Sequence, residues 1–184
     1  MSLQGWSETL ITAQVDGTAL NTSATATSIL PAAAKFTLPA NWCAIGKTLR
    51  FIAQGRISTT ASSPTITFDI RFGAVIVFNG AAVATVSASG QTNKTWQLEA
   101  LLTCRAIGAS TSANLMGIGK LTSSAVVGST GGNANTAMLP DSAPAVGTGF
   151  DSTTSQQVDL FATWSASSAS NSVQLHNFAL ESLN

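Results

Sequence analysis

The stretch TITFDIRF, residues 65–72, decides the fold class of this chain. Its large apolar side chains occupy alternate positions: Ile66, Phe68, Ile70 and Phe72. Thr, Asp and Arg fill the positions between them. A period of two puts the two sets on opposite faces of an extended chain, so this stretch predicts a half-buried antiparallel strand.

The same alternation returns on both sides of this stretch, in residues 48–58, 96–106 and 158–164. In the last apolar segment, Val173 and Leu175 fall on one parity, and Phe178 and Leu180 fall on the other. One extra residue near His176–Asn177, a β-bulge, brings both pairs to the same face.

These segments predict an all-β protein: an antiparallel β-sandwich, jelly-roll-like, with about eight strands. Weaker strands are expected within residues 28–36, 74–79 and 115–122, and Asn79-Gly80 is a hairpin-turn signal. The length of 184 residues fits one domain, which we expect to span residues 28–184.

Two segments depart from the pattern of a compact sandwich. Residues 1–27 begin with Trp6, Leu10 and Ile11 and then turn to Thr, Ser and Ala, which predicts an extended N-terminal arm. Residues 123–155 are rich in Gly, Asn and Ser and predict a long loop. That loop is either a flexible surface loop or one that orders against a neighbouring subunit.

The composition indicates a protein that is covered by partners. Charged residues make up 9% of the chain, against about 25% in ordinary soluble domains, and the formal net charge is zero. Such a surface has little electrostatic repulsion to keep molecules apart. The few Lys and Arg residues are scattered singly, which argues against nucleic acid. No apolar span is long enough for a transmembrane helix, so no membrane contact is expected.

The N-terminal sequence lacks the basic start and the apolar core of a signal peptide, which predicts synthesis in a cytoplasm. Cys43 and Cys104 are therefore expected to be reduced and to act as small apolar side chains, although two cysteines alone do not exclude a bridge.

Motifs for catalysis are missing from the sequence, so we predict no enzyme, no cofactor and no metal. His176 is the only histidine, and we expect it to be a structural or interface residue. Gly46-Lys47-Thr48 ends like a phosphate-binding loop, but the first glycine of that motif is replaced by Asn41. The strand carboxylates are Asp69, Glu99 and Asp159. A pair of them would suit a glycosidase, yet ion pairs with nearby arginines are the simpler explanation.

Aromatic and arginine residues supply the candidate interface. Trp6 in the expected arm and Trp42 after a Pro-containing turn have no obvious place in the core, and aromatic residues commonly anchor interfaces. The full set of interface candidates is Trp6, Leu10, Ile11, Trp42, Arg50, Arg56 and Arg71.

Three stretches resemble small virion structural proteins of tailed bacteriophages: residues 6–12 (WSETLIT), 46–58 (GKTLRFIAQGRIS) and 171–184 (NSVQLHNFALESLN). The resemblance implies a capsid decoration or minor head protein, jelly-roll-like and trimeric, on the outside of the shell. Its implied partners are copies of itself, as a homotrimer, and the major capsid protein. Its implied location is the virion, after synthesis in the cytoplasm of the bacterial host.

Three functions are weighed for this sequence. The first is a non-enzymatic virion protein that docks on a phage capsid as a decoration, cement or minor head protein. The alternative is a carbohydrate- or receptor-binding module of a phage tail or fibre, because jelly rolls also serve as lectins. A hydrolase built on Asp69 or Glu99 ranks last.

Overall fold

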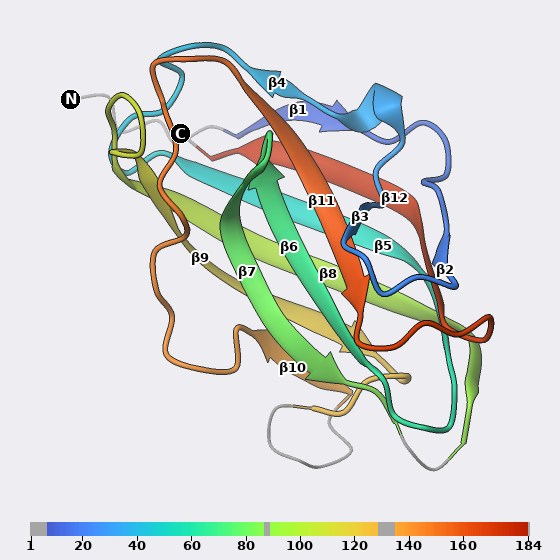
Figure 1. Cartoon of the computed structure of the whole chain (residues 1–184). Helices are drawn as coiled ribbons and strands as arrows, with labels where there is room; N and C mark the ends of the chain where they lie inside the picture. The colour runs from blue at the N-terminus through green and yellow to red at the C-terminus, as the bar shows by residue number, and fades with distance from the viewer. Residues whose placement is uncertain (1–6, 87–88, 129–134, 184) are drawn as a thin grey trace.

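The computed structural model describes residues 7–86, 89–128 and 135–183. They form two antiparallel sheets packed face to face (Figure 1). The larger sheet has the strand order β1-β12-β5-β8-β9-β10, with β2 also paired to β12. Its strands are β1 Glu8–Thr12, β2 Leu20–Asn21, β5 Thr48–Thr59, β8 Gln91–Ala106, β9 Asn114–Ser123, β10 Thr136–Leu139 and β12 Ser172–Ser182.

The smaller sheet has the order β3-β11-β6-β7, with β4 also paired to β11. Its strands are β3 Thr27–Ser28, β4 Thr37–Leu38, β6 Thr65–Phe72, β7 Val75–Ala84 and β11 Gln156–Trp164. The helical structure in the described residues is one 3-10 turn, η1, Ala32–Ala34. The predicted all-β sandwich is confirmed, and no described helix is long and apolar enough to cross a membrane.

The core lies between the sheets and is built by the predicted alternation. In β5, the buried positions begin with Leu49 and Phe51 and continue at every second residue to Thr59. Across the interface, the ring of Phe68 on β6 lies 5.1 Å from the ring of Trp96 on β8, centroid to centroid. Aromatic packing of this kind adds about 1 kcal/mol beyond the burial itself.

The predicted bulge in the last strand is confirmed. The pairing of β12 with β5 shifts register between Leu175 and Asn177, so His176 is the extra residue. This shift lets Leu175 and Phe178 both point into the core. His176 is exposed, and its Nδ1 lies 2.9 Å from Oδ1 of Asp16.

The expected N-terminal arm is part of the sandwich from Glu8 onward. β1 and β2 both pair with the outer edge of β12, and β3 pairs with β11 on the other sheet. An uncovered edge strand leaves backbone N–H and C=O groups unpaired, and this segment supplies the partners. The pairing of β1 contains a bulge between Thr9 and Ile11, which breaks the alternation that would have marked a strand.

The described part of residues 123–155, which leaves out residues 129–134, also packs on its own domain. β10 pairs with β9 along four residues. Further along, Phe150 pairs with Ala113 and packs edge-on against Phe72 with ring centroids 5.0 Å apart. The segment therefore covers the side of the sandwich opposite the N-terminal strands (Figure 1). Burial of its few apolar residues drives the ordering.

The hairpin turn expected at Asn79-Gly80 lies elsewhere. β6 and β7 are joined at Gly73 and Ala74, and Gly73 has the positive φ of 58° that a tight turn needs. Asn79 and Gly80 fall inside β7, where the pairing with β6 is interrupted between Thr67 and Asp69. The Asn-Gly pair therefore marks an irregular part of the strand.

Candidate interaction surfaces

The outer face of the larger sheet carries a patch of exposed apolar side chains, here called the apolar patch. It consists of Leu101, Ile118 and Met138, on β8, β9 and β10. Leu101 and Ile118 are direct cross-strand partners, and the three side chains are 44%, 46% and 45% exposed. With Glu99, Gly119 and Lys120 they line a shallow depression of about 260 Å³. A row of half-exposed large apolar side chains on a sheet face is typical of a protein interaction site.

Four charged side chains next to this patch pair with one another. The guanidinium of Arg50 donates to Glu99 Oε1 from Nε at 2.9 Å and from Nη2 at 2.7 Å, and its Nη1 lies 3.5 Å from Glu181 Oε2. Lys120 Nζ lies 3.2 Å from Glu99 Oε2. Hydrogen bonds from Arg50 and then Lys120 lower the pKa of Glu99 below its ordinary value. The four charges sum to zero, so this surface presents no net charge to a partner.

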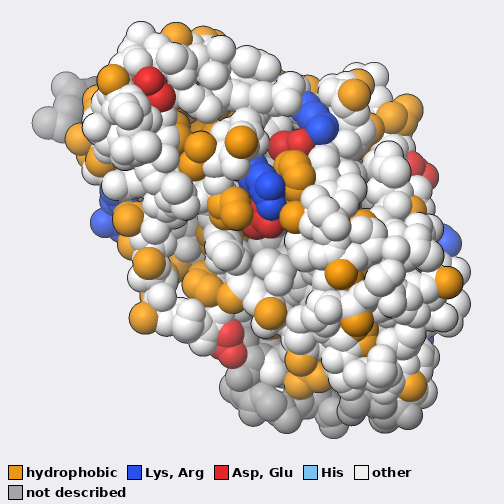
Figure 2. Space-filling model, viewed as in Figure 1, with side chains coloured by type: hydrophobic (Ala, Val, Ile, Leu, Met, Phe, Trp, Pro, Cys, Tyr) orange, Lys and Arg blue, Asp and Glu red, His pale blue; other side chains and the backbone are white. Residues whose placement is uncertain are grey.

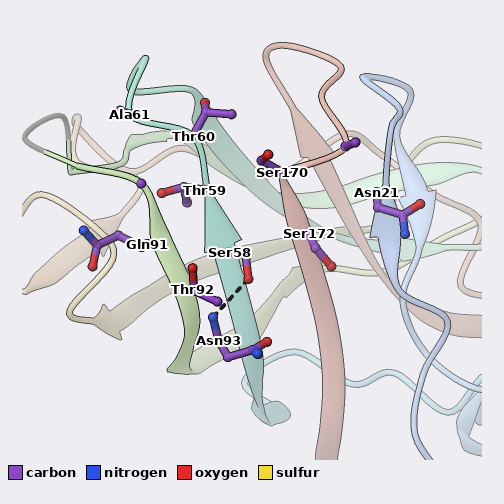
Figure 3. Close-up of a pocket in the computed structure, with 12 residues that line it drawn as sticks. Asn21, Ser58, Thr59, Thr60, Ala61, Gln91, Thr92, Asn93, Ser170 and Ser172 are labelled. Atoms are coloured by element: carbon purple, nitrogen blue, oxygen red, sulfur yellow. Dashed lines mark hydrogen bonds between the residues drawn. The ribbon is translucent and has the colours of Figure 1, made fainter.

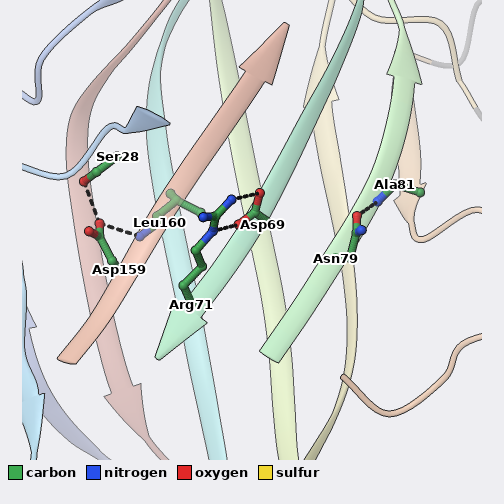
Figure 4. A network of polar contacts seen from close by, with 7 residues as sticks. All are labelled: Ser28, Asp69, Arg71, Asn79, Ala81, Asp159 and Leu160. Carbon is green, nitrogen blue, oxygen red and sulfur yellow. Dashed lines mark hydrogen bonds and ion pairs between the residues drawn. The ribbon is translucent and has the colours of Figure 1, made fainter. Parts of the chain in front are cut away.

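The outer face of the smaller sheet carries a second ion-pair network (Figure 4). Its carboxylates are more deeply buried than those beside the apolar patch. Arg71 Nε donates to Asp69 Oδ1 at 2.5 Å, and the guanidinium carbon lies 4.0 Å from the ring centroid of Phe161. Lys35 Nζ lies 2.7 Å from Asp159 Oδ2. Figure 2 shows blue and red side chains next to one another on this face, near its centre and above it, with orange side chains around them.

The three strand carboxylates that could have formed a hydrolytic pair are thus all ion-paired. Glu99 also lies on a different sheet from Asp69 and Asp159. Asp69 and Asp159 are only 4% and 5% exposed, and Asp159 also accepts hydrogen bonds from the Ser28 hydroxyl and the Leu160 N–H. These contacts favour a structural role for both groups. Within the described ranges, no group of three or more His, Cys, Asp or Glu side chains could hold a metal ion.

A third surface lies at the end of the larger sheet that is distant from Trp42, and we call it the end depression. It has a volume of about 710 Å³. Its lining residues come from the end of β5, the start of β8, β2 and the turn before β12: Asn21, Ser58, Thr59, Thr60, Ala61, Gly90, Gln91, Thr92, Asn93, Ala169, Ser170 and Ser172. All of these side chains are neutral, and most carry a hydroxyl or an amide (Figure 3).

The structure separates the interface candidates rather than grouping them. Trp6 lies outside the described residues. Leu10 and Ile11 are half-buried on the edge strand β1, and both pack against the core. Trp42 is also partly buried against the core, and Lys47 Nζ lies 3.7 Å from the centroid of its ring.

The three arginines among the candidates divide between the sheets. Arg50 and Arg56 lie on the outer face of the larger sheet, and only Arg50 borders the apolar patch. Arg71 lies on the smaller sheet and is held by Asp69.

The residues of the apolar patch were not among the sequence candidates, although a signal was available. Leu101 stands at an outward position of β8, between the buried Ala100 and Leu102. A large apolar residue at a position that alternation assigns to solvent indicates an interaction surface where others gather beside it, as Ile118 and Met138 do here.

The two cysteines are free thiols at the end of the sandwich near Trp42. Cys104 is buried and Cys43 is partly buried. Desolvation, together with the neighbouring Cys104, raises the pKa of Cys43 to about 11. A thiol with so high a pKa is protonated and unreactive at neutral pH.

The comparisons with known proteins find likenesses of structure only. No family model matches the chain, and no curated protein sequence does. One similar solved structure is the CBM2 module of an evolved Dit from Lactobacillus casei BL23 phage J-1, with 12% identity, a TM-score of 0.37, and coverage of 99% of this chain and 98% of that chain. Another is the galectin LEC-6 of Caenorhabditis elegans, with 13% identity, a TM-score of 0.32, and coverage of 84% of this chain and 94% of that chain. At these values neither likeness carries an argument about function.

Proposed function

We propose that this chain is a non-enzymatic structural protein of a tailed-phage particle, which docks on the capsid as a decoration, cement or minor head protein. The observation that carries the proposal is the apolar patch beside a charge network that is already neutralised. The proposal of a tailed-phage particle rests on the resemblance of three stretches of sequence to small virion proteins.

The partner that suits the apolar patch is another folded protein subunit. Leu101, Ile118 and Met138 stand on three neighbouring strands, so they form one rigid apolar area. The ion pairs of Arg50 and Lys120 with Glu99 flank this area. An apolar centre with a polar border is the usual anatomy of a protein interface. The proposed partners are the major capsid protein and further copies of this chain, assembled as a homotrimer.

Co-sedimentation tests this function. The purified protein is mixed with phage particles that lack it, and the bound fraction is measured across a range of concentrations. Leu101→Asp places a charge at the centre of the contact and is expected to weaken binding by about 30-fold or more, as substitutions at interface hot spots do. The matched control is Ile45→Asp, since Ile45 is 69% exposed in the turn before β5, away from the patch. Equal binding by both variants would remove the apolar patch from the proposal.

The alternative function, carbohydrate or receptor binding by a module of a tail or fibre, is favoured by a different observation. The end depression is concave and is lined by neutral groups that both donate and accept hydrogen bonds. That chemistry suits a sugar better than it suits a protein face.

A further inference from the structure

We propose that the end depression binds a neutral, hydroxyl-rich ligand of the saccharide class. This inference rests on the alternative function above and assigns it a site and a ligand chemistry. It is independent of docking through the apolar patch, which lies further along the same face of the larger sheet.

The floor of the end depression is a row of short polar side chains on successive strands. Ser172 of β12 is paired with Asn21 of β2 on one side and with Ser58 of β5 on the other. The Ser58 hydroxyl accepts a hydrogen bond of 3.0 Å from the backbone N–H of Asn93 on β8. Figure 3 shows these four residues in sequence across the sheet. The row therefore presents hydroxyl and amide groups at the regular spacing of neighbouring strands.

A β-bulge places the amide of Asn93 in this row. The pairing of β5 with β8 shifts register between Ile57 and Thr59, so that Thr92 and Asn93 lie opposite Ser58. Asn93 has a positive φ of 49°, which asparagine tolerates better than most residues. Bulges next to binding sites commonly turn one side chain away from the pleat of the strand.

Two turns at the rim of the depression are joined before any ligand arrives. Asn171 is 1% exposed, and its Oδ1 accepts a hydrogen bond of 3.0 Å from the backbone N–H of Thr60. Its Nδ2 donates to the carbonyl of Ala166 at 3.1 Å. One buried amide thus joins the turn after β5 to the turn before β12. A prearranged site loses less conformational entropy on binding than a flexible one.

The lining decides the class of ligand. Of the described residues that line the depression, none carries a charge, so a phosphate or carboxylate would meet no counter-ion. Thr59 also lines it, and its Oγ1 is buried with no hydrogen-bond partner in the described part of the chain. Hydroxyls and amides both donate and accept, as the hydroxyls of a sugar require. No aromatic ring lines the depression within the described ranges, so we expect a dissociation constant on the order of millimolar.

The test is a titration of the uniformly ¹⁵N-labelled full chain followed by amide chemical shifts. The probes are glucose, galactose, N-acetylglucosamine, rhamnose and maltotriose, with inorganic phosphate and glucuronate as charged comparisons. We expect at least one neutral sugar to shift the amides of residues 58–61, 90–93 and 169–172. The charged probes should leave those amides unchanged.

A matched pair of variants assigns the binding to this site. Asn93→Gly removes the amide group and suits the positive φ, and it should weaken sugar binding by about tenfold. Asn135→Gly makes the same change at another exposed asparagine with a positive φ of 52°, outside the depression, and should have no effect. Sugar-induced shifts confined to another surface would keep the binding function and overturn this site. If no neutral sugar causes a shift, the site fails together with the carbohydrate-binding form of the alternative function. Stronger shifts from phosphate would overturn the assigned ligand class.

Discussion

Leu101 on β8 lies directly opposite Ile118 on β9, and both side chains point away from the core with nearly half of their surface exposed. Their neighbours along each strand are buried, so these two residues take the solvent positions of an otherwise regular alternation. Folding alone gains little from apolar groups at these positions, because they stay in water. The proposed docking function gives these two side chains a partner that covers them.

The first prediction separates this docking role from a role in stability. Leu101→Asp and Ile118→Asp should each lower the free energy of unfolding by no more than about 1 kcal/mol, because Asp is a poor strand former but both positions face solvent. Urea denaturation of each purified variant measures this. A loss of several kcal/mol would mean that the patch supports the fold, and the docking argument would lose its basis.

The second prediction concerns the ion pairs beside the patch. Arg50→Gln should raise the pKa of Glu99 toward its ordinary value, because Arg50 is the largest cause of its lowering. A lowered pKa contributes stability above the ordinary pKa that is lost as the pH falls, so the variant should lose less stability on acidification than the wild type. A ¹³C NMR titration of the Glu99 carboxyl checks the pKa. Arg56→Gln, on the same strand and face, is the control, and equal pKa values in both variants would contradict the pairing.

The third prediction concerns the thiols. The rate of Cys43 alkylation by iodoacetamide should be low at pH 8 and should keep rising toward pH 11, because the pKa of this thiol is raised to about 11. In the unfolded chain the thiol releases its proton at a lower pH than in the folded chain. The free energy of unfolding should therefore fall as the pH rises from about 9 to about 11. Mass spectrometry of pulse-labelled protein measures the rate, and the urea-unfolded chain is the reference. A plateau reached near pH 9 in the folded protein would contradict the burial of this thiol.

The fourth prediction tests whether the N-terminal segment belongs to the sandwich. Leu20 on β2 is 4% exposed, so Leu20→Ala should lower the free energy of unfolding by about 3 kcal/mol. Val15, in the same segment, is 60% exposed, and Val15→Ala should change it very little. Thermal and urea unfolding of both variants give the comparison. If neither substitution lowers the free energy of unfolding, the N-terminal segment is the free arm that the sequence predicts.

The fifth prediction concerns the close approach of β5 and β12 at the bulge. A methyl group on Gly55 would lie 1.9 Å from the carbonyl oxygen of Gln174. Gly55→Ala should therefore lower the free energy of unfolding by about 3 kcal/mol, because backbone must move to admit it. Gln54→Ala, on the outer face beside it, should be nearly neutral in the same denaturation experiment. A stable Gly55→Ala variant would mean that the strands are farther apart here.

The strands could be predicted from the sequence because their signal is local. Ile66 and Phe68 reveal a half-buried strand without any knowledge of its partners, and the parity change around His176 is enough to predict a bulge. The edge strands β1 and β10 could not be found in this way. Each is short, and each is held by pairing with a strand that is distant in the sequence, β12 or β9.

The candidate surfaces also differ in whether their signal is local in the sequence. Leu101 could have been singled out from its parity alone, since alternation assigns its position to solvent. The end depression could not, because Asn21, Ser58 and Ser172 are ordinary residues until the fold sets their strands side by side. Arg71 was an interface candidate from the sequence, but the structure pairs it with Asp69 of the same chain.

The most direct test of the docking claim uses a thiol placed within the apolar patch. In the variant Ile118→Cys, the new cysteine should react quickly with a maleimide on the free protein, whereas Cys43 and Cys104 react slowly because their pKa values are raised by burial. On assembled particles, labelling at position 118 should be strongly suppressed, while Ile45→Cys should still be labelled. Equal labelling at position 118 in the free protein and on the particle would contradict docking through this face.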